Sequence, residues 1–250
     1  MFISILTPCW NSARTIERTI KSVLQQNFID YEYIIVDGGS TDGTIGIIKK
    51  YEPLFNGRMK WKSEPDRGIY DAFNKGIRQA KGKYVCIVNS DDWMTPNALD
   101  IIFEKTKEAN EEAVLAFSLN FVDDKGDFIR KQFSGTDYAK YYRQDYIGIM
   151  HPATVVPKSV YDKYGLYDIQ FSIIADADWF HRIVEKQVRI ISYRDTITNM
   201  SQGGVSTQFN LRKESEDRVK YLKKNYSNYF TRVTHYLLWL YHFYYCKYHQ

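Results

Sequence analysis

The stretch YVCIVNSDDW, residues 84–93, decides the fold. Its first five residues, Tyr84–Val88, form a continuous apolar run that is typical of a strand buried on both faces of a sheet. A polar segment, residues 89–92, ends the run. Similar apolar runs occur earlier in the chain, at Phe2–Leu6 and at Tyr33–Val36. Together these runs predict the central strands of a parallel sheet.

Amphipathic stretches separate the predicted strands. Residues 12–26, 41–51 and 70–81 carry apolar side chains at helical spacing, and Lys60–Ser63 fits a further strand. Gly82 suits a left-handed residue after the third helix. The alternation predicts an α/β fold with a mostly parallel sheet flanked by helices, which binds ligands at the carboxyl ends of its strands.

The second half of the chain is more mixed. A turn signal, Asp123-Asp124-Lys125-Gly126, predicts a hairpin between residues 114–122 and 127–133. The segment Ser201–Asn210 is rich in Gly and Ser, which favours a mobile loop. The remaining predicted elements are helices at 97–108, 158–164, 176–186, 211–224 and 229–245, and a strand at Val188–Tyr193.

Composition limits the class of protein. With 250 residues, 44% of them hydrophobic, the chain can bury a large core. The net charge is +4, and residues 211–250 hold eight Lys or Arg against three acids, so the rest of the chain is nearly neutral. A basic tail on a near-neutral body argues against a nucleic-acid-binding protein, which needs basic side chains spread over one face.

The cysteines and the N-terminus bear on the compartment. Cys9, Cys86 and Cys246 are odd in number and far apart, and the first two lie in or beside apolar runs, which predicts buried thiols. The first ten residues lack the basic and long apolar segments of a signal peptide. These features predict a protein of the reducing cytoplasm.

Acidic residues follow three of the predicted strands. A single carboxylate at such a position can be a helix cap. The adjacent pair Asp91-Asp92 is harder to explain as a cap, because one carboxylate suffices and two repel each other. A bound Mg²⁺ or Mn²⁺ accounts for the pair better, since these cations prefer oxygen ligands. The acids are Asp37 after the second strand, Glu64 and Asp66 after the third, and Asp91 and Asp92 after the fourth.

The predicted metal implies a phosphate-bearing substrate. The sequence contains no GxGxxG and no GxxxxGK[ST] loop to hold phosphates. The cation must therefore neutralise much of the phosphate charge, as transfer from a nucleotide-sugar requires when charge grows on the departing diphosphate.

Four ordered blocks resemble glycosyltransferase family 2, whose members invert the anomeric centre and have the GT-A fold. The blocks are TPCWNSARTIERTIKSVLQQ (7–26), YIIVDGGSTDGT (33–44), EPDRGIYDAFNKGI (64–77) and YVCIVNSDDW (84–93). The resemblance continues more thinly through HPATVVPKSVYDKYGLYD (151–168) and IIADADWFHRI (173–183). It implies a donor-binding half at 1–95, an acceptor-binding half at 96–210 and a helical tail at 211–250.

The resemblance also implies roles for residues of the donor half. Pro8 and Asn11 belong to the block whose backbone approaches the nucleotide. Asp37 resembles the acid that binds the base, and Asp66 a second contact to the base or the ribose. The remaining implied contacts are Asp71 and Asn74 on the sugar-diphosphate side, Asp91 at the ribose, and Asp92 as the metal ligand.

Inverting transfer also needs a carboxylate to take the proton of the attacking acceptor hydroxyl. Asp176, in the segment Ala175-Asp176-Ala177-Asp178, matches the position of this base in the family. Asp178 is its rival, and both residues could instead cap the following helix, for which Asp178 is better placed.

Other second-half residues have two interpretations each. His151 is either a structural hydrogen-bonding residue or an acceptor contact. Gly203 and Gly204 form either a plain turn or part of a lid that closes over the donor, with Arg212 reaching the diphosphate.

The expected function is transfer of a sugar from a UDP- or GDP-sugar to a saccharide or lipid-linked saccharide acceptor. A sugar-nucleotide pyrophosphorylase would want a Gly-rich N-terminal loop, which TPCWNSA does not provide. A catalytically inactive sugar- or partner-binding subunit is the alternative from outside the enzymes. Binding of UDP without metal dependence would favour that subunit.

The tail, residues 226–250, contains ten aromatic residues. It is either a helix packed on the domain or on a second copy of the chain, or an interfacial helix that holds the enzyme on the inner face of the membrane. Its apolar part is too short to span a bilayer.

Overall fold

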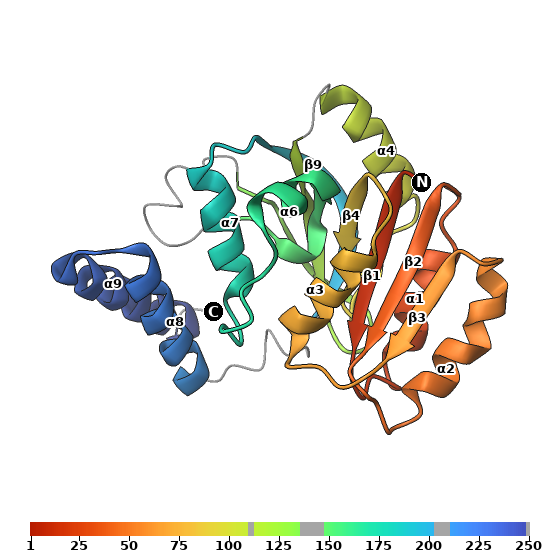
Figure 1. The fold of residues 1–250 in the computed structure, drawn as a ribbon, viewed down its shortest axis with the longest axis horizontal. Coiled ribbons are helices and arrows are strands. Elements are labelled where there is room, and N and C mark those ends of the chain that lie inside the picture. Colours follow the sequence, from red (N-terminus) through yellow and green to blue (C-terminus); the bar gives the residue numbers. More distant parts are fainter. Residues whose placement is uncertain (110–112, 136–147, 203–210, 249–250) are drawn as a thin grey trace.

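The computed structural model describes residues 1–109, 113–135, 148–202 and 211–248. The first half alternates strand and helix, which confirms the predicted pattern (Figure 1). Its elements are β1 (Ile3–Cys9), α1 (Ile16–Leu24), β2 (Tyr31–Asp37), α2 (Thr44–Tyr51), η1 (Glu52–Phe55), β3 (Met59–Ser63), α3 (Ile69–Gln79) and β4 (Tyr84–Ile87).

The second half begins with a two-residue strand and ends in two helices. The hairpin and the helices predicted there are present, whereas the predicted strand at 188–193 overlaps only the first residues of a much longer one, which begins at Ile190. The elements are β5 (Trp93–Met94), α4 (Ala98–Ala109), β6 (Val114–Val122), β7 (Phe128–Gln132), η2 (His151–Ala153), β8 (Thr154–Pro157), α6 (Lys158–Tyr164), α7 (Ala175–Glu185), β9 (Ile190–Ser201), α8 (Leu211–Asn225) and α9 (Tyr229–Tyr248).

All the described strands join one sheet, whose main path runs β3-β2-β1-β4-β8-β6-β9-β5. The first four strands are parallel, as predicted. Beyond β4 the sheet is mixed, because β8 pairs antiparallel with both β4 and β6. The expectation of a mostly parallel sheet is therefore correct only for β1 to β4. β8 carries no clear strand signal in the sequence, because it has four residues and ends in Pro157.

The two faces of the sheet bury separate apolar clusters. Alternate residues of β1 divide between them: Ile3 and Ile5 face the cluster that α1 and α4 complete, and Leu6 faces the one that α3 and α7 complete. Cys9 and Cys86 are buried free thiols, as predicted. This covering of both faces leaves the carboxyl ends of the central strands as the open edge of the sheet.

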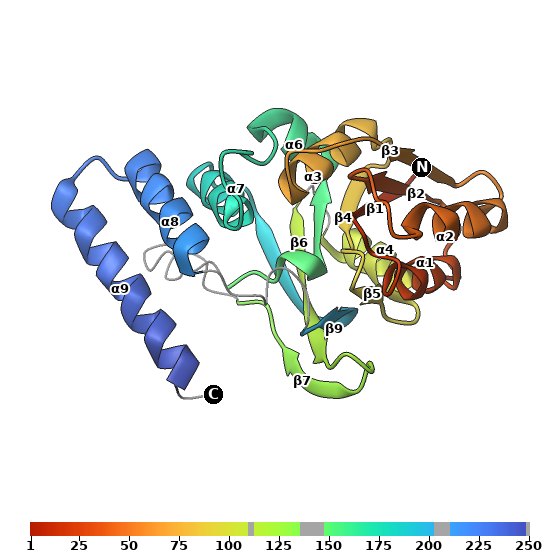
Figure 2. The same ribbon diagram turned by 90° about the horizontal axis from the view of Figure 1, so that it is seen from below.

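The helices α8 and α9 form the outermost part of the molecule. Figures 1 and 2 show α8 beside α7, and α9 on the far side of α8 from the sheet. None of the described helices is long and apolar enough to cross a membrane.

Two glycines, one in α3 and one in the connection between α3 and β4, lie directly on β1. A Cβ atom on Gly76 would come within 2.1 Å of the Leu6 side chain. A Cβ atom on Gly82 would come within 2.5 Å of the backbone nitrogen of Ser4. The prediction that Gly82 is left-handed is wrong, because its φ is not among the positive ones. Close approach to the β1 backbone accounts for this glycine instead.

We predict that Gly76→Ala destabilises the protein by about 1–3 kcal/mol, the usual cost of overpacking a core. The matched control is Gly46→Ala in α2, where an added Cβ would meet nothing within 4 Å. That change should be neutral or stabilising by up to about 1 kcal/mol, because Ala favours helix more than Gly does. Urea unfolding followed by circular dichroism measures both, and equal effects of the two substitutions would contradict the packing argument.

Candidate active site

The pair Asp91-Asp92 lies just beyond the carboxyl end of β4. Asp92 is only 2% exposed, and its carboxylate accepts hydrogen bonds from the Ser201 amide at 3.0 Å and the Asn89 side chain at 3.1 Å. Burial, followed by the charge of Asp91, raises the pKa of Asp92. Burial also raises the pKa of Asp91. The site thus concentrates negative charge that the surrounding protein only partly compensates.

Arg18 supplies the partial compensation, and sequence reasoning missed it. Its guanidinium donates to the Asp91 carbonyl at 3.4 Å and the Ser201 hydroxyl at 3.1 Å, and it stacks on the Trp93 ring at 3.5 Å. Thr19 also binds the loop, with its hydroxyl 2.6 Å from the Asp92 carbonyl. Arg18 and Thr19 lie in α1, which carries an ordinary amphipathic pattern, so no local signal marks them.

A divalent cation fits this loop chemically. Asn89 Oδ1 is buried without a hydrogen-bond partner, so the loop offers an amide oxygen beside the two carboxylates. Oxygen donors of this kind suit Mg²⁺ and Mn²⁺. In the described parts of the chain, no three His, Cys, Asp or Glu side chains are grouped to hold a metal. A cation at Asp92 would therefore need substrate oxygens or water to complete its coordination.

Asp37 ends β2 and is completely buried. Its carboxylate accepts hydrogen bonds from the hydroxyls of Ser40, at 2.5 Å, and Ser63, at 2.6 Å, and from the Gly39 amide at 3.1 Å. Burial alone would raise the pKa of Asp37, but the hydrogen bonds from Ser40 and Ser63 outweigh it and lower the pKa. Asp37 is thus an ionised anchor that holds the loops after β2 and β3 together. Its predicted contact with the base stays a prediction.

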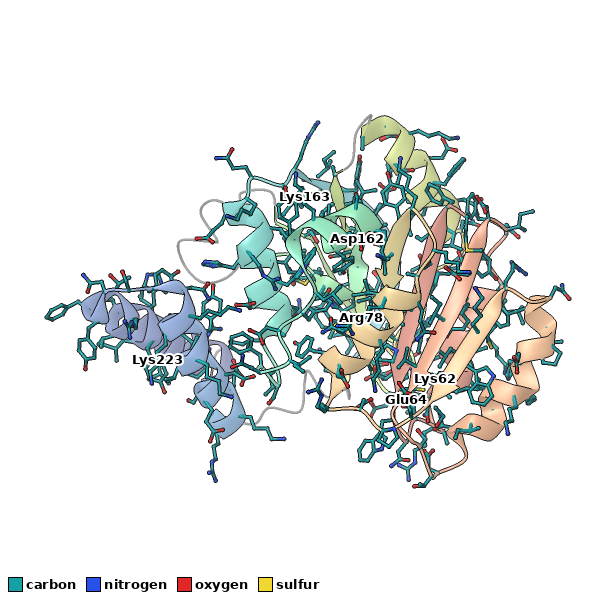
Figure 3. The ribbon with its side chains drawn as sticks, in the orientation of Figure 1. Lys62, Glu64, Arg78, Asp162, Lys163 and Lys223 are labelled. Atoms are coloured by element: carbon teal, nitrogen blue, oxygen red, sulfur yellow. The ribbon has the colours of Figure 1, made fainter. Side chains whose placement is uncertain are left out.

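Asp66 lies against Gly38, at the same edge of the sheet. A Cβ atom on Gly38 would be 2.5 Å from the Asp66 Oδ2 atom, so only glycine leaves room for this carboxylate. The other oxygen, Oδ1, accepts a hydrogen bond from the Gly68 amide at 2.9 Å. Glu64, two residues earlier, forms an ion pair with Lys62 at 2.5 Å on the surface (Figure 3). Of the two acids after β3, Asp66 is thus the one placed against the loop after β2.

The first predicted block places its residues beside this loop. Pro8 lies in β1, in register with Val36. Asn11 has a φ of 48°, its amide donates to the Ser40 hydroxyl, and its side chain accepts from the Thr41 amide. The loops after β1 and β2 therefore form one surface at the sheet edge, as a nucleotide site requires.

Asp71 and Asn74, the two residues of α3 expected on the sugar-diphosphate side, both form hydrogen bonds within the protein. Asp71 accepts a hydrogen bond from the Arg67 amide at 3.1 Å and lies 3.4 Å from the Lys75 ammonium. Asn74 donates to the Tyr167 carbonyl at 2.8 Å and accepts from the Tyr167 amide at 3.0 Å. Asn74 thus joins α3 to the segment before α7, a role that its sequence position does not reveal. Sugar contacts of both residues stay predictions.

Asp176 lies in the first turn of α7 and is half-buried. Tyr70 of α3 reaches it, with the hydroxyl 3.1 Å from the Asp176 Oδ1 atom. The same hydroxyl also donates to the Ile173 carbonyl. Burial and the charge of Asp176 raise the pKa of Tyr70, so the hydroxyl keeps its proton. Asp176 therefore lies where the start of α7 meets α3.

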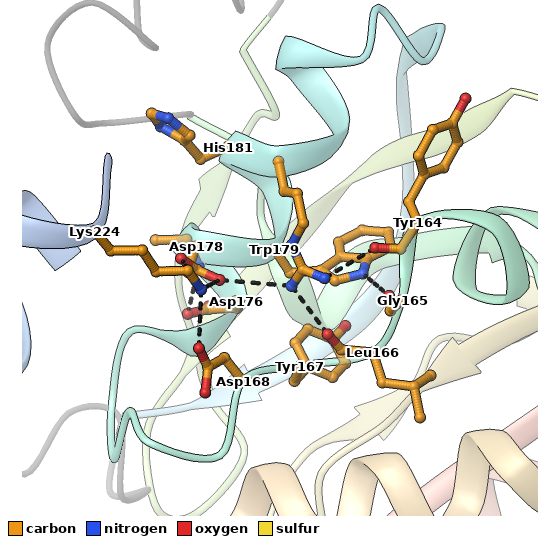
Figure 4. A network of polar contacts seen from close by, with 12 residues as sticks. Tyr164, Gly165, Leu166, Tyr167, Asp168, Asp176, Asp178, Trp179, His181 and Lys224 are labelled. Carbon is orange, nitrogen blue, oxygen red and sulfur yellow. Dashed lines mark hydrogen bonds and ion pairs between the residues drawn. The ribbon is translucent and has the colours of Figure 1, made fainter. Parts of the chain in front are cut away.

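Asp178 has a different environment from Asp176. It is 2% exposed, and its carboxylate lies 2.9 Å from the Lys224 ammonium and 3.5 Å from the Arg182 guanidinium (Figure 4). The interpretation of Asp178 as a helix cap is wrong, because α7 has no side-chain cap and begins after Ile174. The ion pairs neutralise Asp178 and tie it to α8, so it is a poor candidate for the base.

His151 is enclosed by aromatic side chains. It stacks on Phe73 with ring centroids 5.3 Å apart, and its Nε2 atom lies 2.9 Å from the Tyr167 hydroxyl. Burial lowers the pKa of His151, while the charge of Asp176 acts in the opposite direction. A neutral imidazole therefore lies within the electrostatic reach of Asp176, and its contact with an acceptor stays a prediction.

The structure describes only part of the predicted lid. Gly203 and Gly204 lie outside the described residues. Arg212 is in α8, where its side chain is 88% exposed and pairs with Glu216 at 3.0 Å. The structure therefore places Arg212 on the surface of α8, without a contact to the acidic pair.

Comparison with known proteins identifies the family. The description Glycosyl transferase family 2 matches residues 4–165, and the chain belongs to this family. Among its relatives, the chondroitin synthase of Pasteurella multocida is 30% identical over 138 residues, which cover 55% of this chain and 14% of the synthase. The poly(ribitol-phosphate) beta-N-acetylglucosaminyltransferase TarP of Staphylococcus aureus is 32% identical over 117 residues, which cover 45% of this chain and 35% of TarP. The chain thus spans less than half the length of these relatives.

Solved structures establish the GT-A fold. TarS of S. aureus, residues 1–349 in complex with UDP-GlcNAc, superposes with a TM-score of 0.70 at 17% identity, covering 90% of this chain and 66% of that one. The mannosyltransferase PcManGT of Pyrobaculum calidifontis, in complex with GDP-Man and Mn²⁺, gives 0.65 at 16% identity over 90% and 64%. Both likenesses concern the fold, and the predicted GT-A architecture is confirmed.

Proposed function

We propose that the protein transfers a sugar from a UDP- or GDP-sugar to a saccharide or lipid-linked saccharide acceptor, with inversion of the anomeric centre. Asp176 acts as the general base. The observation that carries this proposal is the contact between Asp176 and Tyr70, which sets a half-buried carboxylate at the seam of the two halves. Such a position lets one carboxylate face an acceptor hydroxyl while the donor lies along the sheet edge.

The donor site extends along the carboxyl ends of β1, β2, β3 and β4. Its residues are distributed over loops that bond to one another, which pre-organises the edge for a nucleotide. In the proposed arrangement, Asp37 and Asp66 border the base and ribose, and Asp91 contacts the ribose. Solved relatives of the fold hold UDP-GlcNAc and GDP-Man, which supports a nucleotide-sugar donor.

A divalent cation completes the proposal. Asp92, with Asp91 and Asn89 nearby, would hold Mg²⁺ or Mn²⁺ together with the donor diphosphate. The cation would supply positive charge to the departing nucleoside diphosphate. The fold relative solved with GDP-Man also contains Mn²⁺, which supports this assignment.

We also propose that α9 lies on the surface of a membrane. Several large apolar side chains project from it into solvent, and basic side chains of α8, including the exposed Lys223 in Figure 3, lie on the neighbouring helix. Aromatic rings favour the interface, and each basic residue near anionic lipid contributes about 1 kcal/mol. A lipid-linked acceptor would then be within reach. The exposed apolar residues are Tyr229, Phe230, Val233, Leu237 and Leu238.

We predict that Asp92→Ala abolishes metal-dependent release of nucleoside diphosphate, because the cation loses its main ligand. Asp162→Ala, which changes an exposed aspartate of α6, is the control and should behave as wild type. Isothermal titration of UDP with and without Mn²⁺ should show that binding to wild type depends on the metal. Retention of most activity by Asp92→Ala in Mn²⁺ would refute the ligand assignment, and metal-independent UDP binding without turnover would favour an inactive subunit.

For the base, we predict that Asp176→Asn lowers turnover by about 10²–10⁴-fold, the usual contribution of a general base. Affinity for the donor should change little, because Asp176 faces the acceptor. Initial rates of nucleoside diphosphate release and titration with UDP separate the two effects. A greater loss of turnover in Asp178→Asn than in Asp176→Asn would exchange their roles, and an equal loss of UDP binding would move Asp176 into the donor site.

For the tail, we expect the full chain to sediment with anionic vesicles and to detach as salt is raised. Replacing both Phe230 and Leu237 with Ser should abolish this binding. Leu54→Ser, which removes an exposed apolar side chain far from the tail, is the matched control and should bind as wild type does. If the chain ignores anionic vesicles, and the double substitution dissociates a dimer, α9 is an interface between two copies.

A further inference from the structure

Helix α8 lies beyond residues 4–165, which match the family, yet one of its faces contacts the segment that leads to Asp176. This face consists of Asp217, Tyr221 and Lys224, whose spacing of four and three residues places them on one side of the helix. Asp217 is 1% exposed and Tyr221 is 2% exposed. A buried carboxylate on an otherwise strongly basic helix requires partners, and the structure shows them.

Asp217 binds the backbone just before α7. One of its oxygens, Oδ2, accepts hydrogen bonds from the amides of Ser172, at 2.5 Å, and Ile173, at 2.8 Å. Hydrogen bonds from backbone amides to a charged carboxylate are stronger than those between neutral groups. Two of them on one oxygen therefore fix the position of Ile173, three residues before Asp176.

The other end of this face holds α7 itself. Lys224 lies 2.9 Å from Asp168 and 2.9 Å from Asp178, so it joins the two ends of the segment that contains Asp176 (Figure 4). Between Asp217 and Lys224 on the same face of α8, the Tyr221 hydroxyl lies 2.6 Å from the His181 Nδ1 atom. Helix α8 therefore holds this segment before and after the position of Asp176.

The position of Ile173 matters because of Tyr70. The Tyr70 hydroxyl has one proton, and two acceptors lie within reach of it, the Ile173 carbonyl and the Asp176 carboxylate. While Ile173 stays in place, Tyr70 and the Ala177 amide, which donates to Oδ1 at 2.9 Å, hold this oxygen of Asp176. The second carboxylate oxygen, Oδ2, is then the atom that can accept a proton from the substrate.

We propose that Asp217 is a positioning residue for the base: it holds Ile173, whose carbonyl shares the Tyr70 proton with Asp176, and so keeps the Asp176 carboxylate in its orientation. The proposal rests on the assignment of Asp176 as the base of a sugar transfer. It makes the basic tail part of the catalytic apparatus and not only an attachment to it.

The test is a double-mutant cycle on the full chain, measured as nucleoside diphosphate release at saturating donor and acceptor. Asp217→Ala should lower kcat by about 10–100-fold, the order of loss that follows from a misplaced catalytic group. Asp217→Asn, which keeps an oxygen acceptor at the same place, should retain more activity than Asp217→Ala. Donor affinity and the circular dichroism spectrum should be unchanged in both variants, and Asp162→Ala serves as the exposed control.

The cycle separates this proposal from the proposed function. If Asp217 acts through the base, adding Asp217→Ala to Asp176→Asn should cause little further loss. Full additivity of the two losses, or wild-type kcat in Asp217→Ala, would overturn the positioning role while leaving the base assignment intact. Full turnover in Asp176→Asn alone would instead overturn the base assignment. If Asp217→Ala fails to fold, Asp217→Asn takes its place in the cycle: its kcat must fall at unchanged donor affinity, and a wild-type kcat would overturn the positioning role.

Discussion

The structure of the site depends on the Tyr70 hydroxyl, which crosses from α3 to the start of α7. A second contact of this kind lies one turn further along α3, where the Asn74 side chain forms two hydrogen bonds with the Tyr167 backbone. These contacts join α3 to the segment, residues 167–176, that ends at Asp176. Burying a hydroxyl or an amide without a hydrogen-bond partner costs free energy, so these bonds hold the two segments in one arrangement. Misalignment by about 1 Å can cost a large part of an enzyme's rate, so such bonds would help to hold Asp176 in place as the proposed base.

The acidic loop after β4, in contrast to these stabilising bonds, destabilises the protein. Asp91 and Asp92 are neighbours in this loop, where burial raises the pKa of both and the charge of Asp91 raises the pKa of Asp92 further. Arg18 and the Ser201 amide lower this cost without removing it. An arrangement that is unfavourable for the protein alone becomes favourable when a cation and a diphosphate are added. This is consistent with the proposed use of Asp92 as a metal ligand.

Much of the fold could be predicted from the sequence. Long apolar strands and amphipathic helices indicated the order of the donor half, and acids at the strand ends located its open edge. The antiparallel β8 could not be predicted, because four residues that end in Pro157 give no periodic signal. The roles of Arg18, Asn74 and Asp217 could not be predicted either. Each depends on contacts between segments more than 40 residues apart, and local pattern carries no information about these.

The central claim is that Asp176 directs an acceptor hydroxyl to the face of the sugar opposite the departing diphosphate. The stereochemistry of the product tests it most directly. With an α-linked nucleotide-sugar as donor, the proton NMR spectrum of the purified product should show a β linkage. An α linkage in the product would mean that the configuration is retained, and would contradict the assignment of Asp176 as the base of a single displacement.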